Sequence, residues 1–218
     1  MSKRIGVVLS GCGFLDGAEI HEAVLTLYAL DRAGATTVCM APNVEQAQVV
    51  NHRTQEPMNE KRNVLVESAR IARGQIRDIA EVEARELDGL VLPGGFGAAL
   101  NLSDFAKKGH GAAVHPAVAR LVAEVFAQKK PIGAICIAPS VVAVVLGKDH
   151  PTLTIGNDAG TAKEIETCGA KHVDCVTESY VLDADHKVVS TPAYMLGPSI
   201  RHVGAGIEQL ISEVMRMA

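Results

Sequence analysis

The sequence contains very few aromatic residues: no tryptophan, three tyrosines and four phenylalanines among 218 residues. Its hydrophobic content is nevertheless 48%, so the core must be built from Val, Ala, Leu and Ile. A chain of this length, with 21% charged residues, has the composition of a globular α/β protein and is long enough to bury a substantial core. We therefore expect residues 1–218 to form a single domain.

The sequence also lacks an excess of positive charge. It contains 21 Lys and Arg residues against 25 Asp and Glu residues, which gives a net charge of −4. Because nucleic-acid binding depends on basic side chains that neutralise phosphates, this balance argues against a nucleic-acid partner.

Long apolar runs are missing as well. The run at residues 5–9 is too short for the hydrophobic region of a signal peptide. The longest uncharged run, residues 131–147, contains two prolines and is shorter than a bilayer span. The five cysteines are odd in number and form no C-x-x-C pair, which argues against a disulfide framework. We expect a soluble cytoplasmic protein with no membrane partner.

No motif for a cofactor or a metal stands out. Gly11, Gly13 and Gly17 imitate a dinucleotide-binding fingerprint, but their spacing is wrong and Asp16 would repel a phosphate. The eight histidines are scattered without the spacing of metal ligands. The sequence therefore predicts neither a cofactor nor a metal site.

Segments with strand and helix patterns alternate along the chain. A strand at residues 3–9, a helix at 19–33 and a strand at 36–41 open it, which suggests a parallel sheet with a right-handed crossover. Further strands are predicted at residues 48–52, 76–79, 89–92, 132–135, 152–155, 172–176, 180–182 and 187–190. Further helices are predicted at residues 63–72, 116–128, 137–146, 161–168 and 199–217, and a loop at 103–113. This alternation predicts an α/β fold with a doubly wound, mainly parallel sheet.

The stretch at residues 131–139, Pro-Ile-Gly-Ala-Ile-Cys-Ile-Ala-Pro, organises the rest of the chain. Residues 132–135 have the pattern of a short buried strand, and residues 137–146 that of a buried helix with Pro139 in its first turn. Cys136 therefore lies at a sharp strand-to-helix junction, where backbone N–H groups and the helix dipole favour a thiolate. An unselected cysteine in an apolar stretch is more often a structural residue, but the junction favours a nucleophile.

Sites in parallel sheets gather at the carboxyl ends of the strands. The loop at residues 10–17, the segment 93–97 and Cys136 each follow a predicted strand. Gly94 and Gly95 would let the backbone approach a reacting carbonyl closely, and with the N–H of Ile137 they would make an oxyanion hole. Taken alone, a Gly-Gly pair is equally explained by a turn that only glycine can adopt.

Two acidic residues, Glu19 and Glu22, begin the first predicted helix beside the same sheet edge. Acidic residues are common in a first turn because they compensate the helix dipole, so both have a generic explanation. A carboxyl close to a thiolate would have its pKa raised by like charge and desolvation. It could then shuttle a proton near neutral pH.

Three motifs together resemble the PfpI branch of the class I glutamine-amidotransferase-like superfamily. They are Gly-Ala-Glu-x-x-Glu at residues 17–22, Leu-Pro-Gly-Gly at 92–95 and Ala-Ile-Cys at 134–136. The longer stretches around them closely resemble the ElbB proteins, known as isoprenoid or enhancing lycopene biosynthesis proteins and as glyoxalases. The resemblance covers essentially the whole chain.

This resemblance implies a flavodoxin-like sheet, a nucleophile at Cys136 and a partner acid at Glu22. It also implies cofactor-free conversion of glyoxal, a small dicarbonyl substrate, to glycolate, and a homodimer. An apparent deglycase activity would follow from the same aldehyde chemistry. The chain departs from the triad hydrolases of the superfamily: no His-x-Glu follows Cys136, and Ile137 stands where PfpI-type peptidases carry a histidine. The resemblance therefore implies a pair of catalytic residues, Cys136 and Glu22, without a histidine.

A second hypothesis is a redox-sensing or partner-binding protein that keeps the reactive cysteine but turns over slowly. A thiolate is the form of cysteine most readily oxidised to sulfenic or sulfinic acid. Cys12 lies in a loop expected at the same strand ends, so it is a candidate resolving thiol for Cys136.

Overall fold

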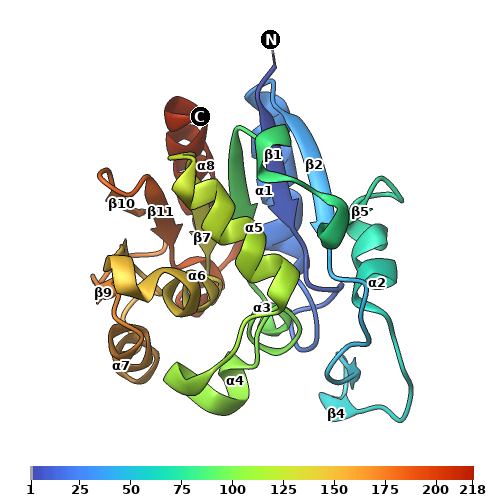
Figure 1. Ribbon diagram of the computed structural model, residues 1–218. Helices are drawn as coiled ribbons and strands as arrows, with labels where there is room; N and C mark the ends of the chain where they lie inside the picture. Colours follow the sequence, from blue (N-terminus) through green and yellow to red (C-terminus); the bar gives the residue numbers. More distant parts are fainter. Residues whose placement is uncertain (1) are drawn as a thin grey trace.

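A seven-stranded sheet forms the centre of the computed structural model, which describes residues 2–218 (Figure 1). Its strands are β1 (Arg4–Val8), β2 (Thr36–Ala41), β5 (Arg77–Asp78), β6 (Gly89–Leu92), β7 (Ile132–Ile135), β10 (Val181–Asp183) and β11 (Val188–Thr191). They lie in the order β10-β11-β7-β6-β1-β2-β5. All neighbouring strands are parallel except β10, which is antiparallel to β11. The predicted α/β, flavodoxin-like, mainly parallel sheet is confirmed.

Side chains of the central strands alternate between the two faces of the sheet, as the pleat requires. In β6, Leu90 and Leu92 pack into one core and Val91 packs into the other. In β7, Ala134 and Ile135 are divided in the same way. Both strands are buried on both faces, which explains why their sequences are continuous apolar runs.

Helices cover both faces of this sheet. One core lies under α1 (Ile20–Arg32), α2 (Val64–Ile71) and α8 (Ile200–Met217). The other lies under α3 (Phe96–Leu100), α5 (Pro116–Ala127), α6 (Pro139–Leu146) and α7 (Ala159–Thr167), and Figure 1 shows α5 across the near face. Within residues 2–218, none of these helices is both long enough and apolar enough to cross a bilayer.

Most helix boundaries follow from local capping. The side chain of Glu19 accepts the N–H of Glu22 and caps α1, and Asn63 accepts the N–H of Val66 and caps α2. Pro116 and Pro139 each take the first position of their helix, where the missing N–H needs no partner. These ends agree with the predicted ones to within one or two residues.

The structure differs from the sequence prediction between residues 93 and 113. The predicted loop at 103–113 contains the short helix α4 (Phe105–Lys108) and a 3-10 helix (Gly109–Gly111), and α3 begins directly after Gly95. Each is a single turn or little more, too short for an apolar periodicity to develop. Phe105 is buried and anchors α4.

Some predicted strands are shorter and lie outside the main sheet. Strands β3 (Val50–Asn51) and β4 (Glu56–Pro57) form one two-stranded sheet, and β8 (Thr152–Leu153) and β9 (Lys171–His172) form another. Two 3-10 helices, Ile79–Glu81 and Ala84–Glu86, lie between β5 and β6. Further 3-10 helices lie at Gly147–Asp149 and Ala193–Met195.

The sheet order reverses next to β1. The chain continues from β1 to β2 on one side, whereas β6, β7 and β11 follow on the other. In open parallel sheets, ligands bind beyond the carboxyl ends of the strands at such a switch point. The segments that leave β1, β6, β7 and β11 at this edge supply the side chains and N–H groups of the candidate site.

Candidate active site

Cys136 occupies a strained elbow between β7 and α6. Its φ of 61° lies in the left-handed region, which a side chain other than glycine rarely adopts. Its N–H donates to the carbonyl oxygen of Thr191 on β11 at 2.9 Å, which holds the turn in place. The residue is only 7% exposed. The predicted strand-to-helix junction is therefore present, with the backbone geometry of a nucleophile elbow.

Glu22 meets Cys136 from the first turn of α1. Its carboxyl is fully buried, and it interacts with the Cys136 thiol through a side-chain hydrogen bond. Its Oε2 accepts the N–H of Gly94 at 3.0 Å, and its Oε1 accepts the N–H of Tyr194 at 3.1 Å. One carboxyl thus joins α1 to the segments that follow β6, β7 and β11.

The two glycines after β6 are required by close packing. A Cβ on Gly94 would lie 2.5 Å from the Cβ of Cys136 and 2.7 Å from Oε2 of Glu22, so no larger residue fits there. Gly95 has a φ of 93°, and a Cβ there would lie 2.3 Å from the backbone nitrogen of Glu19. The Gly-Gly pair therefore lets the backbone approach the thiol, beyond what a turn alone demands.

The predicted oxyanion hole needs one correction. The N–H of Gly94 is directed at Glu22 and is not available to a substrate. The N–H groups of Gly95 and Ile137 both contact the Cys136 sulfur. A developing oxyanion next to that sulfur would therefore find donors at Gly95 and Ile137, while Gly94 orients the acid.

Burial controls the ionisation of the pair. Desolvation raises the pKa of Glu22 to about 8, against hydrogen bonds from Tyr194, Cys136 and Gly94 that lower it. Desolvation, followed by the charge of Glu22, also raises the pKa of the Cys136 thiol well above its ordinary value, although the N–H groups of Gly95 and Ile137 oppose this. The expectation that the elbow by itself favours a thiolate is therefore wrong, because burial outweighs the N–H groups.

A cavity of ≈ 350 Å³ opens above the sulfur. Its walls are mainly apolar and include Phe14, Phe96, Ile137 and Met195. The other lining residues are Glu19, Gly95, Cys136, Thr161 and Tyr194. No histidine is among these residues, and no group of three metal-ligating side chains occurs in residues 2–218.

Tyr194 is a part of the site that the sequence did not predict. Its N–H binds Glu22, and its hydroxyl lies 2.8 Å from Nδ1 of His21. The signal was available in part, because Tyr194 follows β11 at the same sheet edge as the other segments. Every residue except proline has a backbone N–H, however, so residue type cannot show which N–H binds Glu22. The adjoining Ala193 has a positive φ of 44°, which is not expected for an alanine.

The structure also locates Glu19 and Cys12 relative to the cavity. Glu19 is the N-cap residue of α1, where its side chain accepts the N–H of Glu22, and it also lines the cavity. The charged neighbours that shift the pKa of Cys12 are Glu67, Arg70, Asp16 and Arg62, none of which lines the Cys136 cavity. Cys12 also does not line that cavity, so the structure does not support it as a resolving thiol.

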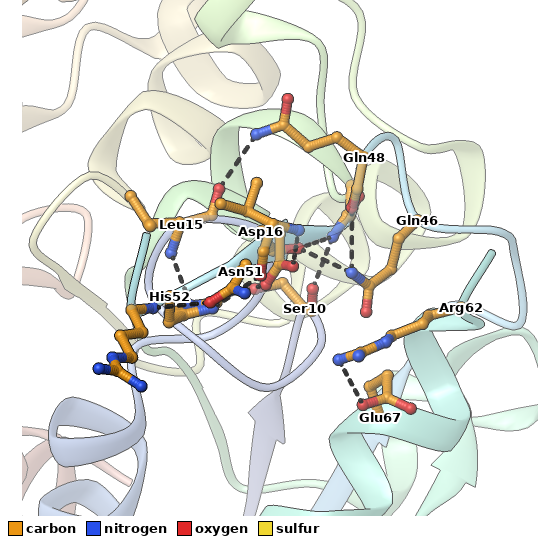
Figure 2. A network of polar contacts seen from close by, with 12 residues as sticks. Ser10, Leu15, Asp16, Gln46, Gln48, Asn51, His52, Arg62 and Glu67 are labelled. Carbon is orange, nitrogen blue, oxygen red and sulfur yellow. Dashed lines mark hydrogen bonds and ion pairs between the residues drawn. The ribbon is translucent and has the colours of Figure 1, made fainter. Parts of the chain in front are cut away.

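The loop at residues 10–17 is held by a network of buried polar groups (Figure 2). The carboxylate of Asp16 accepts the N–H of Val50 at 2.8 Å. The side-chain amide of Asn101 donates to the carbonyls of Ser10 and Asp16, both at 2.8 Å. The N–H of Leu15 donates to Nε2 of His52 at 3.3 Å. This network fixes the backbone on either side of Phe14 at the cavity.

A known protein family matches most of the chain. Residues 12–190 match the DJ-1/PfpI family. The chain belongs to this family. The resemblance to the PfpI branch is therefore confirmed at the level of the family.

The chain is 44% identical to the rat ES1 protein homolog, mitochondrial, over 98% of this chain and 84% of that protein. It is also 44% identical to human glutamine amidotransferase-like class 1 domain-containing protein 3, mitochondrial, over 99% and 84%. A crystal structure of an isoprenoid biosynthesis protein with an amidotransferase-like domain from Ehrlichia chaffeensis is 41% identical, covers 99% of both chains and superposes with a TM-score of 0.94. These relatives share the architecture over essentially the whole chain.

These relatives also correct the expected localisation. The rat and human proteins are both named as mitochondrial, which contradicts the cytoplasmic assignment made from the sequence. That assignment used the lack of a disulfide framework and of long apolar runs. Such features do not distinguish one soluble compartment from another, so composition could not decide the question.

The buried carboxyl predicts a pH-dependent loss of stability. Unfolded Glu22 ionises near its ordinary pKa of 4.5, whereas the folded protein keeps it protonated up to about pH 8. The cost in folding free energy of burying Glu22 is absent below pH 4.5, grows between pH 4.5 and 8, and reaches on the order of 5 kcal/mol above pH 8. In urea unfolding at pH 5 and pH 9, the wild type should therefore lose more stability than Glu22→Gln.

The matched control is Glu19→Gln, which leaves Glu22 in place. The charge of Glu19 is a smaller cause of the raised pKa of Glu22 than burial is, so this variant should keep most of the wild-type pH dependence. The quantity to compare is the change in the free energy of unfolding between pH 5 and pH 9. Glu22→Gln would place an amide NH₂ against the N–H of Gly94 or of Tyr194, which lowers stability at both pH values and cancels from this difference. Parallel curves for the wild type and Glu22→Gln would contradict the raised pKa.

Proposed function

We propose that this protein is a glutathione-independent glyoxalase that converts glyoxal to glycolate, with Cys136 as nucleophile and Glu22 as proton shuttle. The observation that carries the proposal is the fully buried Glu22 carboxyl in contact with the Cys136 thiol. Its pKa of about 8 suits a group that must both give and take a proton near neutral pH. The reaction needs no redox cofactor, because the oxidation of one substrate carbon is balanced by the reduction of the other.

The reactive form of the pair carries one proton, on Glu22, and a Cys136 thiolate. The sulfur forms a bond to one aldehyde carbon, the carbonyl electron pair moves to oxygen, and that oxygen takes the proton from Glu22. The N–H groups of Gly95 and Ile137, which act on the neighbouring sulfur, would donate to this oxygen while it is charged. The result is a hemithioacetal beside an ionised Glu22.

Glu22 then moves a proton between the two substrate carbons. Its carboxylate takes the hydrogen from the carbon bonded to sulfur, which gives an enediolate with its charge on the oxygen of the second carbon. The hydroxyl proton of the sulfur-bearing carbon passes to that oxygen, and Glu22 returns its proton to the second carbon, which gives a thioester. Water attacks the thioester, the C–S bond breaks, and glycolate leaves with the pair restored. The same addition to an aldehyde would act on a dicarbonyl released from a glycated amine or thiol, which would register as deglycase activity.

The structural observations favour this proposal over a redox sensor. Cys12 has different neighbours and is not placed as a resolving partner. A proton-shuttling acid beside the sulfur has no evident role in a sensor.

Loss of the nucleophile provides the first test. Cys136→Ser should abolish glyoxal loss and glycolate formation, both followed without glutathione, because a serine hydroxyl is far less acidic than a thiol. The control is Cys12→Ser, which should keep the wild-type rate. If Cys136→Ser and the wild type turn glyoxal over equally fast, the proposal fails.

The second test compares the two acidic residues of α1. Glu22→Gln should lower the rate by roughly 10²–10⁴, because an amide cannot take and return a proton. Glu19→Gln should cost far less, because its amide oxygen still accepts the N–H of Glu22. Wild-type turnover should rise with pH through about 8, as the pair loses the first of its protons. A similar rate in both variants would show Glu22 to be only a first-turn charge.

We further propose that two copies associate through α1. Ile20, Val24 and Tyr28 are exposed and spaced four residues apart, so they form one apolar stripe along the outside of the helix. A second copy of the chain could cover the same stripe about a two-fold axis. The stripe begins next to Glu22, so the dimer would also shield the site's first helical turn.

This arrangement predicts that Val24→Glu yields a monomer, because it places a charge in the centre of the stripe. The matched control is Val66→Glu on α2, an exposed valine away from the stripe, which should leave the assembly unchanged. Sedimentation or light scattering gives the mass of each variant. A wild-type monomer, or a dimer that survives Val24→Glu, would refute the interface.

A further inference from the structure

One step of the proposed reaction moves a proton between two substrate oxygens, and neither Cys136 nor Glu22 is free to carry it. At that moment Glu22 holds the proton taken from carbon, and the sulfur of Cys136 is bonded to the substrate. The two oxygens sit on neighbouring carbons, so a direct transfer would bend the O–H bond far from the straight line that hydrogen bonds prefer. A third group that both gives and takes a proton would allow two well-aligned hydrogen bonds instead.

The lining of the cavity offers few such groups. Apart from the nucleophile, the lining side chains that can exchange a proton are Glu19, Thr161 and Tyr194. The carboxyl of Glu19 accepts the N–H of Glu22 at 2.7 Å, which holds it at the cap of α1. The hydroxyl of Thr161 is hydrogen-bonded to the carboxylate of Asp158, the N-cap residue of α7. The hydroxyl of Tyr194 therefore fits the role best.

Tyr194 is held at both ends by the first turn of α1. Its backbone N–H donates to Oε1 of Glu22 at 3.1 Å, and its hydroxyl lies 2.8 Å from Nδ1 of His21. The two rings lie with their centroids 5.8 Å apart. His21 directly precedes Glu22 on α1, whereas Tyr194 belongs to the 3-10 helix after β11. The phenol is thus fixed beside the turn that carries the acid.

The surroundings of Tyr194 keep its hydroxyl protonated. Desolvation raises the pKa of Tyr194 above its ordinary value, and the charges of Glu19 and Glu22 raise it further. A neutral phenol donates one hydrogen bond and accepts others. When Nδ1 of the exposed His21 carries a hydrogen, it donates to the phenol oxygen and leaves the phenol hydrogen for a substrate oxygen.

We propose that the Tyr194 hydroxyl is a catalytic group that carries the proton between the two substrate oxygens, and that His21 positions it. This inference rests on the proposed glyoxalase function. The phenol O–H bond breaks as its proton bonds to the charged oxygen of the second carbon, and the phenol oxygen takes the hydroxyl proton of the sulfur-bearing carbon. The electron pair left there forms the thioester carbonyl as Glu22 protonates the second carbon. Tyr194 ends the cycle unchanged.

The main test is Tyr194→Phe, which keeps the ring and the backbone N–H that binds Glu22 and removes the hydroxyl. Its kcat for glyoxal should fall by about 10²-fold, whereas its KM should stay within about 2-fold of the wild type. The matched control is Tyr180→Phe, which removes a hydroxyl that lies 3.3 Å from Glu213 and does not line the cavity. This control should keep the wild-type kcat.

The positioning role of His21 is tested in combination with Tyr194. His21→Phe should lower kcat by about 10-fold, because the phenol loses the donor that orients it. His21→Asn, whose amide nitrogen can take the place of Nδ1, should keep most of the rate. The double variant His21→Phe/Tyr194→Phe should be no slower than Tyr194→Phe alone, because His21 acts only through the hydroxyl. Independent, multiplying effects would refute this role of His21.

The rate at which iodoacetamide alkylates Cys136 reports separately on the Cys136–Glu22 pair, and Tyr194→Phe should leave that rate unchanged. If Tyr194→Phe keeps the wild-type kcat, or if its alkylation rate changes as much as its kcat, the relay is overturned and the glyoxalase function stands. If the wild type converts glyoxal no faster than Cys136→Ser does, both proposals fall together.

Discussion

The burial of the Glu22 carboxyl without a counter-charge is the constraint on which the rest of the site depends. No basic side chain in the described part of the chain contributes to its pKa, and its neighbours are the thiol of Cys136 and the N–H groups of Gly94 and Tyr194. An ionised carboxylate in such surroundings costs several kcal/mol, so burial favours the protonated form of Glu22. The two N–H donors come from segments after β6 and β11, and the thiol comes from the segment after β7. One side chain on α1 therefore contacts the segments that follow three different strands.

Close approach of the backbone is what makes this convergence possible. Cys136 adopts a positive φ so that its side chain faces Glu22, and Gly94 leaves no Cβ between them. A residue held in a sparsely populated conformation costs of order 1–3 kcal/mol, and it persists only where its surroundings determine it. Here the hydrogen bond from the N–H of Cys136 to Thr191 and the buried strands β6 and β7 hold Cys136 in this conformation. The rigid sheet thus supports a strained turn that an isolated loop would not keep.

Much of this arrangement could be predicted from the sequence, because buried parallel strands and helix caps have strong local signals. The short apolar runs at 89–92 and 132–135 located two strand ends, and with them Gly95, Cys136 and Ile137. Other parts depend on tertiary contacts that residue type does not record. The N–H of Gly94 turned toward Glu22, and the N–H of Tyr194 came from a 3-10 turn after β11. The direction of the Cys136 pKa was misjudged because the junction was visible in the sequence, whereas the depth of burial was not.

The raised pKa of Glu22 also accounts for the missing histidine. A triad hydrolase uses histidine because its ordinary pKa near 6.5 lets it accept and return a proton at neutral pH. A carboxyl normally titrates too low for that purpose, but desolvation brings Glu22 to about 8, on the other side of neutrality. The same burial would suit a histidinium poorly, since it would penalise the positive charge that the triad mechanism creates. In the proposed mechanism the proton moves through Glu22 on α1, so that mechanism needs no histidine at position 137.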